Sequence, residues 1–265
     1  MKRVPVLIFL CFLACVAAAG QARPACPYGP APCEAYEQAD AVFVGTVTKV
    51  VPATTRMEWT DADYDQTAYV AIKKVYKGYE SRSIVLRQLG RRKAQKFIQG
   101  ASYLFYANYD RASRIWEVRP CGRTVMSEYA QLDLRYVEGL RGLAGRTRVS
   151  GKVTRFNNVA DAEGAAPRGL AGVRVKLTGG GREYEARTDA GGIFEFLDLP
   201  PGRYRVEARV PNTLVFFGAI HTGPDPIGRA RTLELELAER GCAEVILLYT
   251  DDKPPRPEGG RQVGR

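Results

Sequence analysis

Few side chains in this sequence could carry out chemistry, and histidine is the scarcest. The 265 residues contain one histidine, His221, in the stretch FFGAIHTGPDP. A Ser-His-Asp hydrolase would have to use it, yet no serine lies in the Gly-x-Ser-x-Gly motif that presents a nucleophile. A zinc peptidase needs several histidine ligands or an equivalent set. The sequence therefore predicts no catalytic residue, no metal site and no cofactor, and it favours a loop position for His221.

One acidic stretch has the spacing of a calcium loop. Asp61, Asp63 and Asp65 alternate as calcium ligands do, but Gln66 stands at the position of the turn glycine and Ile72 at that of the closing glutamate. A solvated turn is the better interpretation.

Asp189, in TDAGGIFEFLDLPPGRYRV, raises the question of a catalytic loop. Two glycines follow it, Gly191 and Gly192, and a Pro-Pro-Gly run ends the hydrophobic stretch after them. Glycine gives the backbone freedom that a tight turn needs, and an aspartate side chain commonly accepts hydrogen bonds from its own turn. We therefore predict that Asp189 closes a turn between two strands.

The amino-terminal residues have the order of a secretory signal. Lys2 and Arg3 precede an uncharged apolar stretch from Val4 to Ala19, and small residues follow before Arg23. We expect residues 1–22 to be removed and the mature chain to lie in the periplasm, at the cell surface or outside the cell. The apolar stretch is shorter than the ~20 residues that cross a bilayer, so we predict no transmembrane segment.

Processing by a second route would leave a lipid on the protein. The tetrapeptide FLAC, which ends at Cys15, resembles a bacterial lipoprotein box, although Phe12 stands where that pattern usually has leucine. A lipid anchor at Cys15 therefore stays open.

Four cysteines remain after the signal: Cys26, Cys33, Cys121 and Cys242. An even number in an exported chain favours disulfides, and zinc is disfavoured because no Cys-x-x-Cys is present. Four cysteines allow three pairings, and their positions alone do not separate them.

The formal charge of +10 reflects 39 basic against 29 acidic residues. A basic exported protein suits an anionic envelope polymer, but the charges are scattered, and the densest run, at Arg91 to Lys93, is typical of a solvated loop. We leave the partner as an unknown protein or an anionic envelope polymer and predict no specific nucleic-acid binding. Six aromatic residues could stack bases or sugars, but alternation favours a core position for most of them: Tyr69, Tyr76, Tyr103, Phe105, Tyr106 and Trp116.

The hydrophobic patterns divide the mature chain into two β-rich parts. Residues 26–143 contain a short helix at 34–38 and a valine-rich strand around Val42 and Phe43, and four further strands are expected at 67–78, 83–89, 101–109 and 113–121. An amphipathic helix is expected over 126–141. Five strands fit an OB-like barrel with this helix packed on it.

Residues 149–250 alternate more cleanly, which is typical of a β-sandwich. Seven strands are expected, at 149–156, 172–179, 182–188, 192–199, 202–210, 231–239 and 243–250. Residues 251–265 lack apolar content, and we expect them to form a disordered tail.

The second part resembles the carboxypeptidase regulatory-like family through VSGKVT, GLAGVRVKLTG, TDAGGIFEFLDLPPGRYRV and GCAEVILLY. The resemblance covers about residues 149–250 and implies a transthyretin-like sandwich that acts as a non-catalytic accessory domain.

The first part, residues 26–143, resembles the netrin-type module of tissue inhibitors of metalloproteinases through ADAVFVGTV, VYKG, GASYLFYA and CGRTVMSEYAQLDLRYVEGL. The resemblance implies an OB-like barrel whose amino-terminal segment is tied to it by a disulfide, here preferably Cys26–Cys121. The module's usual further cysteine is missing before GASYL, which leaves Cys33 free to pair with Cys242 across the two parts.

Inhibition in that family uses an amino-terminal cysteine to bind the zinc of the protease. Cleavage directly before Cys26 would place Arg23 and Pro24 at positions that signal peptidase disfavours, so an extension should block this mechanism. We therefore expect a non-catalytic exported protein that binds or scaffolds, with a protease inhibitor or modulator as the alternative.

Overall fold

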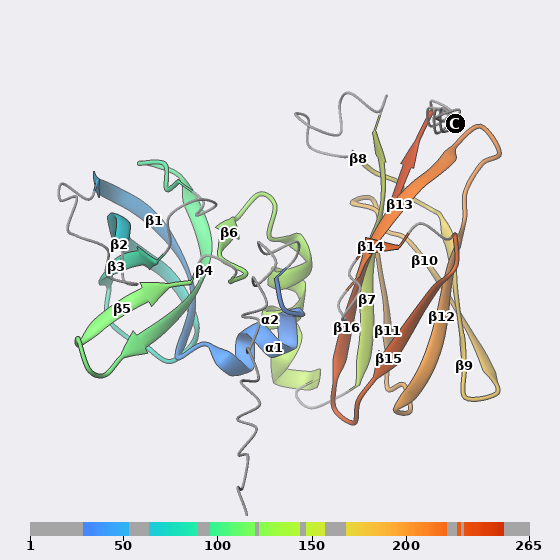
Figure 1. Ribbon diagram of the computed structural model, residues 1–265, viewed down its shortest axis with the longest axis horizontal. Coiled ribbons are helices and arrows are strands. Elements are labelled where there is room, and N and C mark those ends of the chain that lie inside the picture. The colour runs from blue at the N-terminus through green and yellow to red at the C-terminus, as the bar shows by residue number, and fades with distance from the viewer. Residues whose placement is uncertain are drawn as a thin grey trace, which may run out of the picture.

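Two β bodies lie side by side, with two short helices between them (Figure 1). The computed structural model describes residues 29–52, 64–89, 96–119, 122–143, 147–156, 168–221, 227–228 and 231–251. The predicted signal, Cys15, Cys26, Cys121, the acidic residues 61 and 63, and the tail after Asp251 lie outside the described residues. The helices are α1 (Pro32–Gln38) and α2 (Gln131–Leu143). Neither they nor any other helix in the described ranges is long and apolar enough to cross a bilayer.

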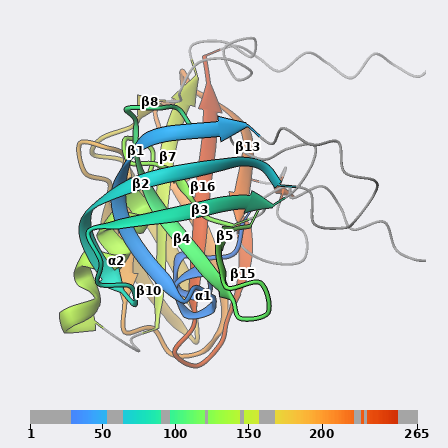
Figure 2. The same ribbon diagram turned by 90° about the vertical axis from the view of Figure 1, so that its left-hand side faces the viewer.

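The first body, called the barrel below, is built from six strands. They are β1 (Ala41–Pro52), β2 (Tyr64–Lys77), β3 (Ser83–Leu89), β4 (Ser102–Asp110), β5 (Ile115–Val118) and β6 (Val125–Met126). The order β1-β2-β3-β5-β4 closes on itself because β4 also pairs with β1, and the β3–β5 pair is parallel. Figure 2 shows these strands curving around one another. The structure confirms the expected five-stranded OB-like barrel.

Aromatic side chains fill the barrel. Phe43, Tyr103 and Phe105 are fully buried, with ring centroids 5.2 Å apart for Phe43 and Phe105 and 5.6 Å apart for Tyr103 and Phe105. Tyr106 is also buried, whereas Tyr69 is 41% exposed. Alternation along β4 thus places Tyr103 and Phe105 in the barrel core, whereas Tyr106 on the opposite face packs with Val137 of α2. The six aromatics do not form one exposed stacking surface.

The amphipathic helix begins later than the sequence predicts. We expected it at residue 126, but α2 starts at Gln131, and Val125 and Met126 form β6, which pairs with Leu104 and Tyr103 of β4. Met126 is partly buried and packs on the barrel core. Met126 therefore matches the helical spacing of apolar residues although it lies in a strand. Burial at a sheet edge requires an apolar residue at this position just as burial of a helix face would.

The second body, called the sandwich below, contains two packed sheets. Its strands are β7 (Arg148–Phe156), β8 (Arg168–Gly169), β9 (Arg174–Gly179), β10 (Arg182–Arg187), β11 (Ile193–Leu197), β12 (Gly202–Arg209), β13 (Val215–His221), β14 (Ile227–Gly228), β15 (Leu233–Leu237) and β16 (Cys242–Thr250). One sheet has the order β10-β9-β12-β15, and the other has the order β11-β7-β16-β13-β14 with β8 on β7. The core between them includes Leu177, Val206 and Leu247, all fully buried. The mainly β fold is confirmed.

One long strand of the sandwich was missed. We expected a loop around His221, but His221 ends β13 and pairs in register with Val245 of β16. The register shifts between Phe216 and Gly218, and Phe217 is exposed. This bulge interrupts the alternation on which the prediction depended.

Asp189 closes its turn as predicted. Its Oδ1 accepts hydrogen bonds from the backbone N–H groups of Gly191 and Ile193, each 2.9 Å long. Gly192 has a φ of +78°, and a Cβ there would lie 2.5 Å from the carbonyl oxygen of Val153. The turn therefore needs both the aspartate and the glycine, and Asp189 needs no catalytic role to explain it.

Replacing Asp189 should weaken the sandwich measurably. Partial burial pushes the pKa of Asp189 up, but hydrogen bonds from Ile193 N–H and from Arg135 outweigh it and lower that pKa. We expect Asp189→Ala to cost about 1–2 kcal/mol of unfolding free energy in urea, since solvent weakens part of the interaction. Asp189→Asn should cost less because an amide oxygen still accepts the turn bonds. Equal stability of all three proteins would contradict this role.

Candidate functional site

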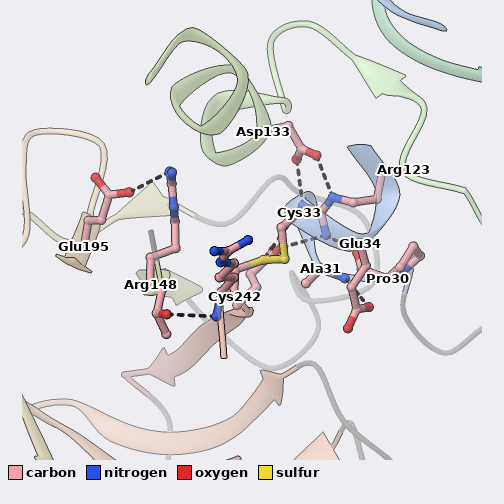
Figure 3. Close-up of a disulfide and its surroundings, with 12 residues drawn as sticks. Pro30, Ala31, Cys33, Glu34, Arg123, Asp133, Arg148, Glu195 and Cys242 are labelled. Atoms are coloured by element: carbon pink, nitrogen blue, oxygen red, sulfur yellow. Dashed lines mark hydrogen bonds and ion pairs between the residues drawn. A yellow bond between two sulfur atoms is a disulfide. The ribbon is translucent and has the colours of Figure 1, made fainter. Parts of the chain in front are cut away.

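Buried charges meet where the barrel contacts the sandwich, as Figure 3 shows. Arg123, from the segment between β5 and β6, binds Asp133 of α2 through Nε at 2.5 Å and Nη2 at 2.7 Å. Its Nη1 lies 2.6 Å from Oε2 of Glu244 on β16 and donates to the Pro30 carbonyl at 2.9 Å. One guanidinium thus joins the barrel, its helix and the sandwich.

Strand alternation explains why Glu244 faces the barrel. Ala243, Val245 and Leu247 of β16 point into the sandwich core. Glu244 lies between Ala243 and Val245, so its side chain points out of this core. Glu244 is nevertheless only 8% exposed, because the barrel covers that face of β16. Asp133 reaches the same place from the first turn of α2.

Two carboxylates share this one guanidinium in a largely dry environment. Burial would lower the pKa of Arg123, but the charges of Asp133 and Glu244 outweigh it and raise that pKa. Burial raises the pKa of Glu244, and it raises the pKa of Tyr106, whose hydroxyl donates to Asp133 at 2.8 Å. The cluster of Arg123, Asp133, Glu244 and Tyr106, called the interface cluster below, is therefore an interdependent set of charges and hydrogen bonds.

A covalent bond lies beside the interface cluster. Cys33 of α1 and Cys242 of β16 form a disulfide with Cα atoms 6.0 Å apart and a sequence separation of 209 residues (Figure 3). These are the two cysteines that the sequence left for a pairing across the two parts. Cys26 and Cys121, the preferred pair, lie outside the described residues.

Further contacts run along α2. The guanidinium of Arg148, a 2% exposed residue of β7, stacks on the Tyr136 ring with its Cζ 4.7 Å from the centroid. Lys152 of the same strand donates to Gln131 at 2.9 Å. Arg135 forms an ion pair with Asp189. One side of α2 is thus held against the sandwich at several points.

Among the described residues, the cavity beside Arg123 has no arrangement suited to a reaction. A cavity of about 220 Å³ lies next to Arg123, lined by Pro30, Ala35, Gln38, Ala39, Tyr106, Asn108, Arg119 and Gly122. These residues supply amides, a phenol and guanidinium groups but no nucleophile beside a base. Within the described ranges, no three His, Cys, Asp or Glu residues are placed to hold a metal ion.

The interface cluster was not visible in the sequence. Glu244 sits as one acidic residue in the apolar run AEVILLY, and that break is the single signal that could have marked it. Nothing in the spacing of Arg123, Asp133 and Glu244 relates them, because the contacts depend on how two separately folded bodies meet.

The raised pKa of Glu244 predicts a pH effect. A carboxyl whose pKa is higher in the folded state stabilises that state most at low pH, and the contribution is lost as pH rises through the folded pKa. Glutamine cannot ionise, so Glu244→Gln should gain stability relative to the natural protein as the pH rises above the ordinary pKa of a glutamate. Urea unfolding at several pH values measures this difference.

Glu138 supplies the control for that measurement. Hydrogen bonds from Lys74 and Tyr76 lower the pKa of Glu138, so Glu138→Gln should lose relative stability as pH rises. The same trend in both variants would show that burial does not control the ionisation of Glu244.

Comparison with known proteins gives no family for the chain. No family model matches it, and no curated protein matches it. Among solved structures, a DUF3823 family protein from Parabacteroides merdae shows 20% identity over 40% of this chain, with a TM-score of 0.26. That match spans 46% of the Parabacteroides chain, less than half its length.

Two further structures cover more of the chain at lower identity. The minor pilin GBS52 of Streptococcus agalactiae shows 8% identity over 83% of this chain and 87% of its own, with a TM-score of 0.29. The major pilin subunit BcpA of Bacillus cereus shows 12% identity over 83% of this chain and 61% of its own, with a TM-score of 0.26. At these scores the comparison identifies β-rich neighbours and carries no conclusion about activity or assembly.

Proposed function

We propose that this chain is a non-catalytic, exported binding or scaffolding protein of the periplasm or cell surface, and that it holds its two β bodies in one fixed relation. The observation that carries the proposal is the interface, where a disulfide and a buried ion cluster occur together. An enzyme would need converging reactive groups, whereas the polar groups here are used for contacts between the bodies.

The contacts support a rigid connection for a physical reason. A single linker between α2 and β7 would allow the bodies to reorient, and relative motion is the default for parts joined in that way. The Cys33–Cys242 bond adds a second covalent connection far from the linker in sequence. If the bodies rotated about the linker and the disulfide, Glu244 would separate from Arg123. Both charges are buried, so leaving them unpaired would cost folding free energy.

Within this proposal, residues 26–143 form a netrin-like module and residues 149–250 a carboxypeptidase regulatory-like domain. The OB-like barrel and the sandwich are compatible with both assignments. The Cys26–Cys121 bond belongs to the same proposal, and mass spectrometry of the non-reduced mature protein tests it together with the cleavage site and a lipid on Cys15.

Small-angle X-ray scattering of the mature protein tests the fixed relation. We expect the curve of the natural protein to fit one arrangement of the two bodies. A variant that combines Cys33→Ala, Cys242→Ala and Arg123→Met should require a range of arrangements if each body stays folded. A natural protein that already requires such a range would overturn the proposal, and so would an enzymatic activity lost in a folded His221→Ala variant.

A further inference from the structure

A row of three arginines crosses the outer face of the sheet β10-β9-β12-β15. Arg174 of β9 pairs in register with Arg187 of β10 on one side and with Arg209 of β12 on the other. Residues directly opposite each other on antiparallel strands have Cα atoms about 4.5–5.5 Å apart. Three like charges are thus held at neighbouring positions on a flat surface.

All three side chains point away from the sandwich core. Val175, Ala186 and Ala208, each next to one of the arginines, pack toward the core, so alternation turns the arginines outward. Arg187 and Arg209 are exposed, and the Arg174 side chain is 41% exposed. Figure 1 places this sheet on the side of the sandwich away from the barrel. The row is therefore open to a partner and separate from the interface cluster.

Acidic side chains neutralise only part of the positive charge of this row. Glu185 binds Arg174 at 3.0 Å, and Arg187 donates to the carbonyl of Gly172 at 3.3 Å. Arg209 forms no ion pair with any residue in the described ranges. Like charges directly opposite one another destabilise a sheet, so this arrangement has a cost that a bound anion would relieve.

The next row differs in charge. Lys176 lies between Glu185 and Glu207, which are its register partners on β10 and β12. A polymer of high charge density, such as a nucleic acid or a poly-acidic peptide, would meet these glutamates as like charges. A glycan that carries both carboxylates and hydroxyls would offer anions to the arginines and hydrogen-bond donors to the glutamates.

Other features of this face favour the same ligand. Its outward residues are all polar, and they are Arg174, Lys176, Thr178, Glu183, Glu185, Arg187, Arg203, Arg205, Glu207, Arg209, Glu234 and Glu236. Aromatic rings for base stacking and apolar side chains for insertion into a membrane are thus absent from these positions. Arginine binds carboxylates through two parallel hydrogen bonds.

From these observations we infer that the row of Arg174, Arg187 and Arg209 binds an acidic polysaccharide through its carboxylates. This site does not depend on the rigid connection between the two bodies.

Binding of polygalacturonate to the full mature protein tests the inference. We expect saturable binding that the double variant Arg174→Gln/Arg209→Gln weakens about 100-fold, because each lost charged hydrogen-bonding group costs roughly tenfold. The matched control is Arg203→Gln/Arg205→Gln, which removes the same charge from the same face opposite Glu236 and Glu234. It should weaken binding less than about threefold.

Thermal unfolding of both variants guards against a folding defect. We expect the Arg174→Gln/Arg209→Gln variant to melt no lower than the natural protein, since it removes a like-charge contact. Absence of polygalacturonate binding to the natural protein would overturn the inference, as would equal weakening in the two variants. Tighter binding of polyglutamate or of phosphatidylglycerol vesicles would show that the partner is an acidic peptide or a membrane and would overturn it too.

Discussion

Arg123→Met should destabilise the protein by about 3–5 kcal/mol at neutral pH. The substitution keeps a long apolar side chain but leaves Asp133 and Glu244 buried without the guanidinium that they share. An uncompensated buried charge is far more costly than the net gain from an ion pair. Urea unfolding followed by tryptophan fluorescence and by circular dichroism would measure the loss.

Arg119→Met is the matched control, because Arg119 is an exposed residue close to the same cavity. It should change the unfolding free energy by less than about 0.5 kcal/mol. Adding Glu244→Gln to Arg123→Met should recover part of the loss, since one of the two unpaired charges disappears. A loss no larger than that of the control would mean that the interface cluster contributes nothing to folding.

Removing the disulfide should have the second large effect. Cys33→Ala/Cys242→Ala opens a loop closed over a separation of 209 residues, and the loss of such a bond typically costs about 2–5 kcal/mol. Chain entropy accounts for most of this in one model, since the bond restricts the unfolded chain over most of its length. We also expect the natural protein to unfold in a single transition and the variant to unfold in two, one for each body.

Mild reduction of the natural protein provides an independent comparison. Cys33 is 7% exposed and Cys242 is half-buried, hence a low reductant concentration should reduce the bond only slowly in the folded protein. Full reduction in urea should reproduce the alanine variant on refolding. One unchanged transition in the variant would show that the remaining contacts, such as Arg148 on Tyr136, hold the two bodies together without the bond.

The fold could be predicted largely because both bodies bury alternating strands. Tyr204 and Val206 of β12 are buried between exposed charged residues, and β3 has the bounds that the sequence predicts, Ser83–Leu89. The failures have local causes. Gly218 lies at a bulge in β13, and Met126 satisfies a helical period from a strand.

The interface was much less predictable than the bodies. Periodicity reports which face of a strand is buried, but it does not report what buries it. The sequence alone would place Glu244 on the surface, because it does not show that the barrel covers this residue. Arg123 lies two residues after Cys121, in a stretch with no clear hydrophobic period. The arginine row could not be predicted for a similar reason. The register across three strands makes Arg174, Arg187 and Arg209 neighbours, and the sequence does not give this register.

The position of β16 constrains how the protein matures. This strand follows every other described strand in the chain and supplies both Cys242 and Glu244. The barrel can therefore complete its own hydrogen bonding before β16 is available, while Cys33 is still a thiol. If the chain is exported as proposed, an oxidant that acts early would meet Cys33 together with Cys26 and Cys121, so correct maturation would require either slow oxidation or an isomerase that reshuffles early bonds.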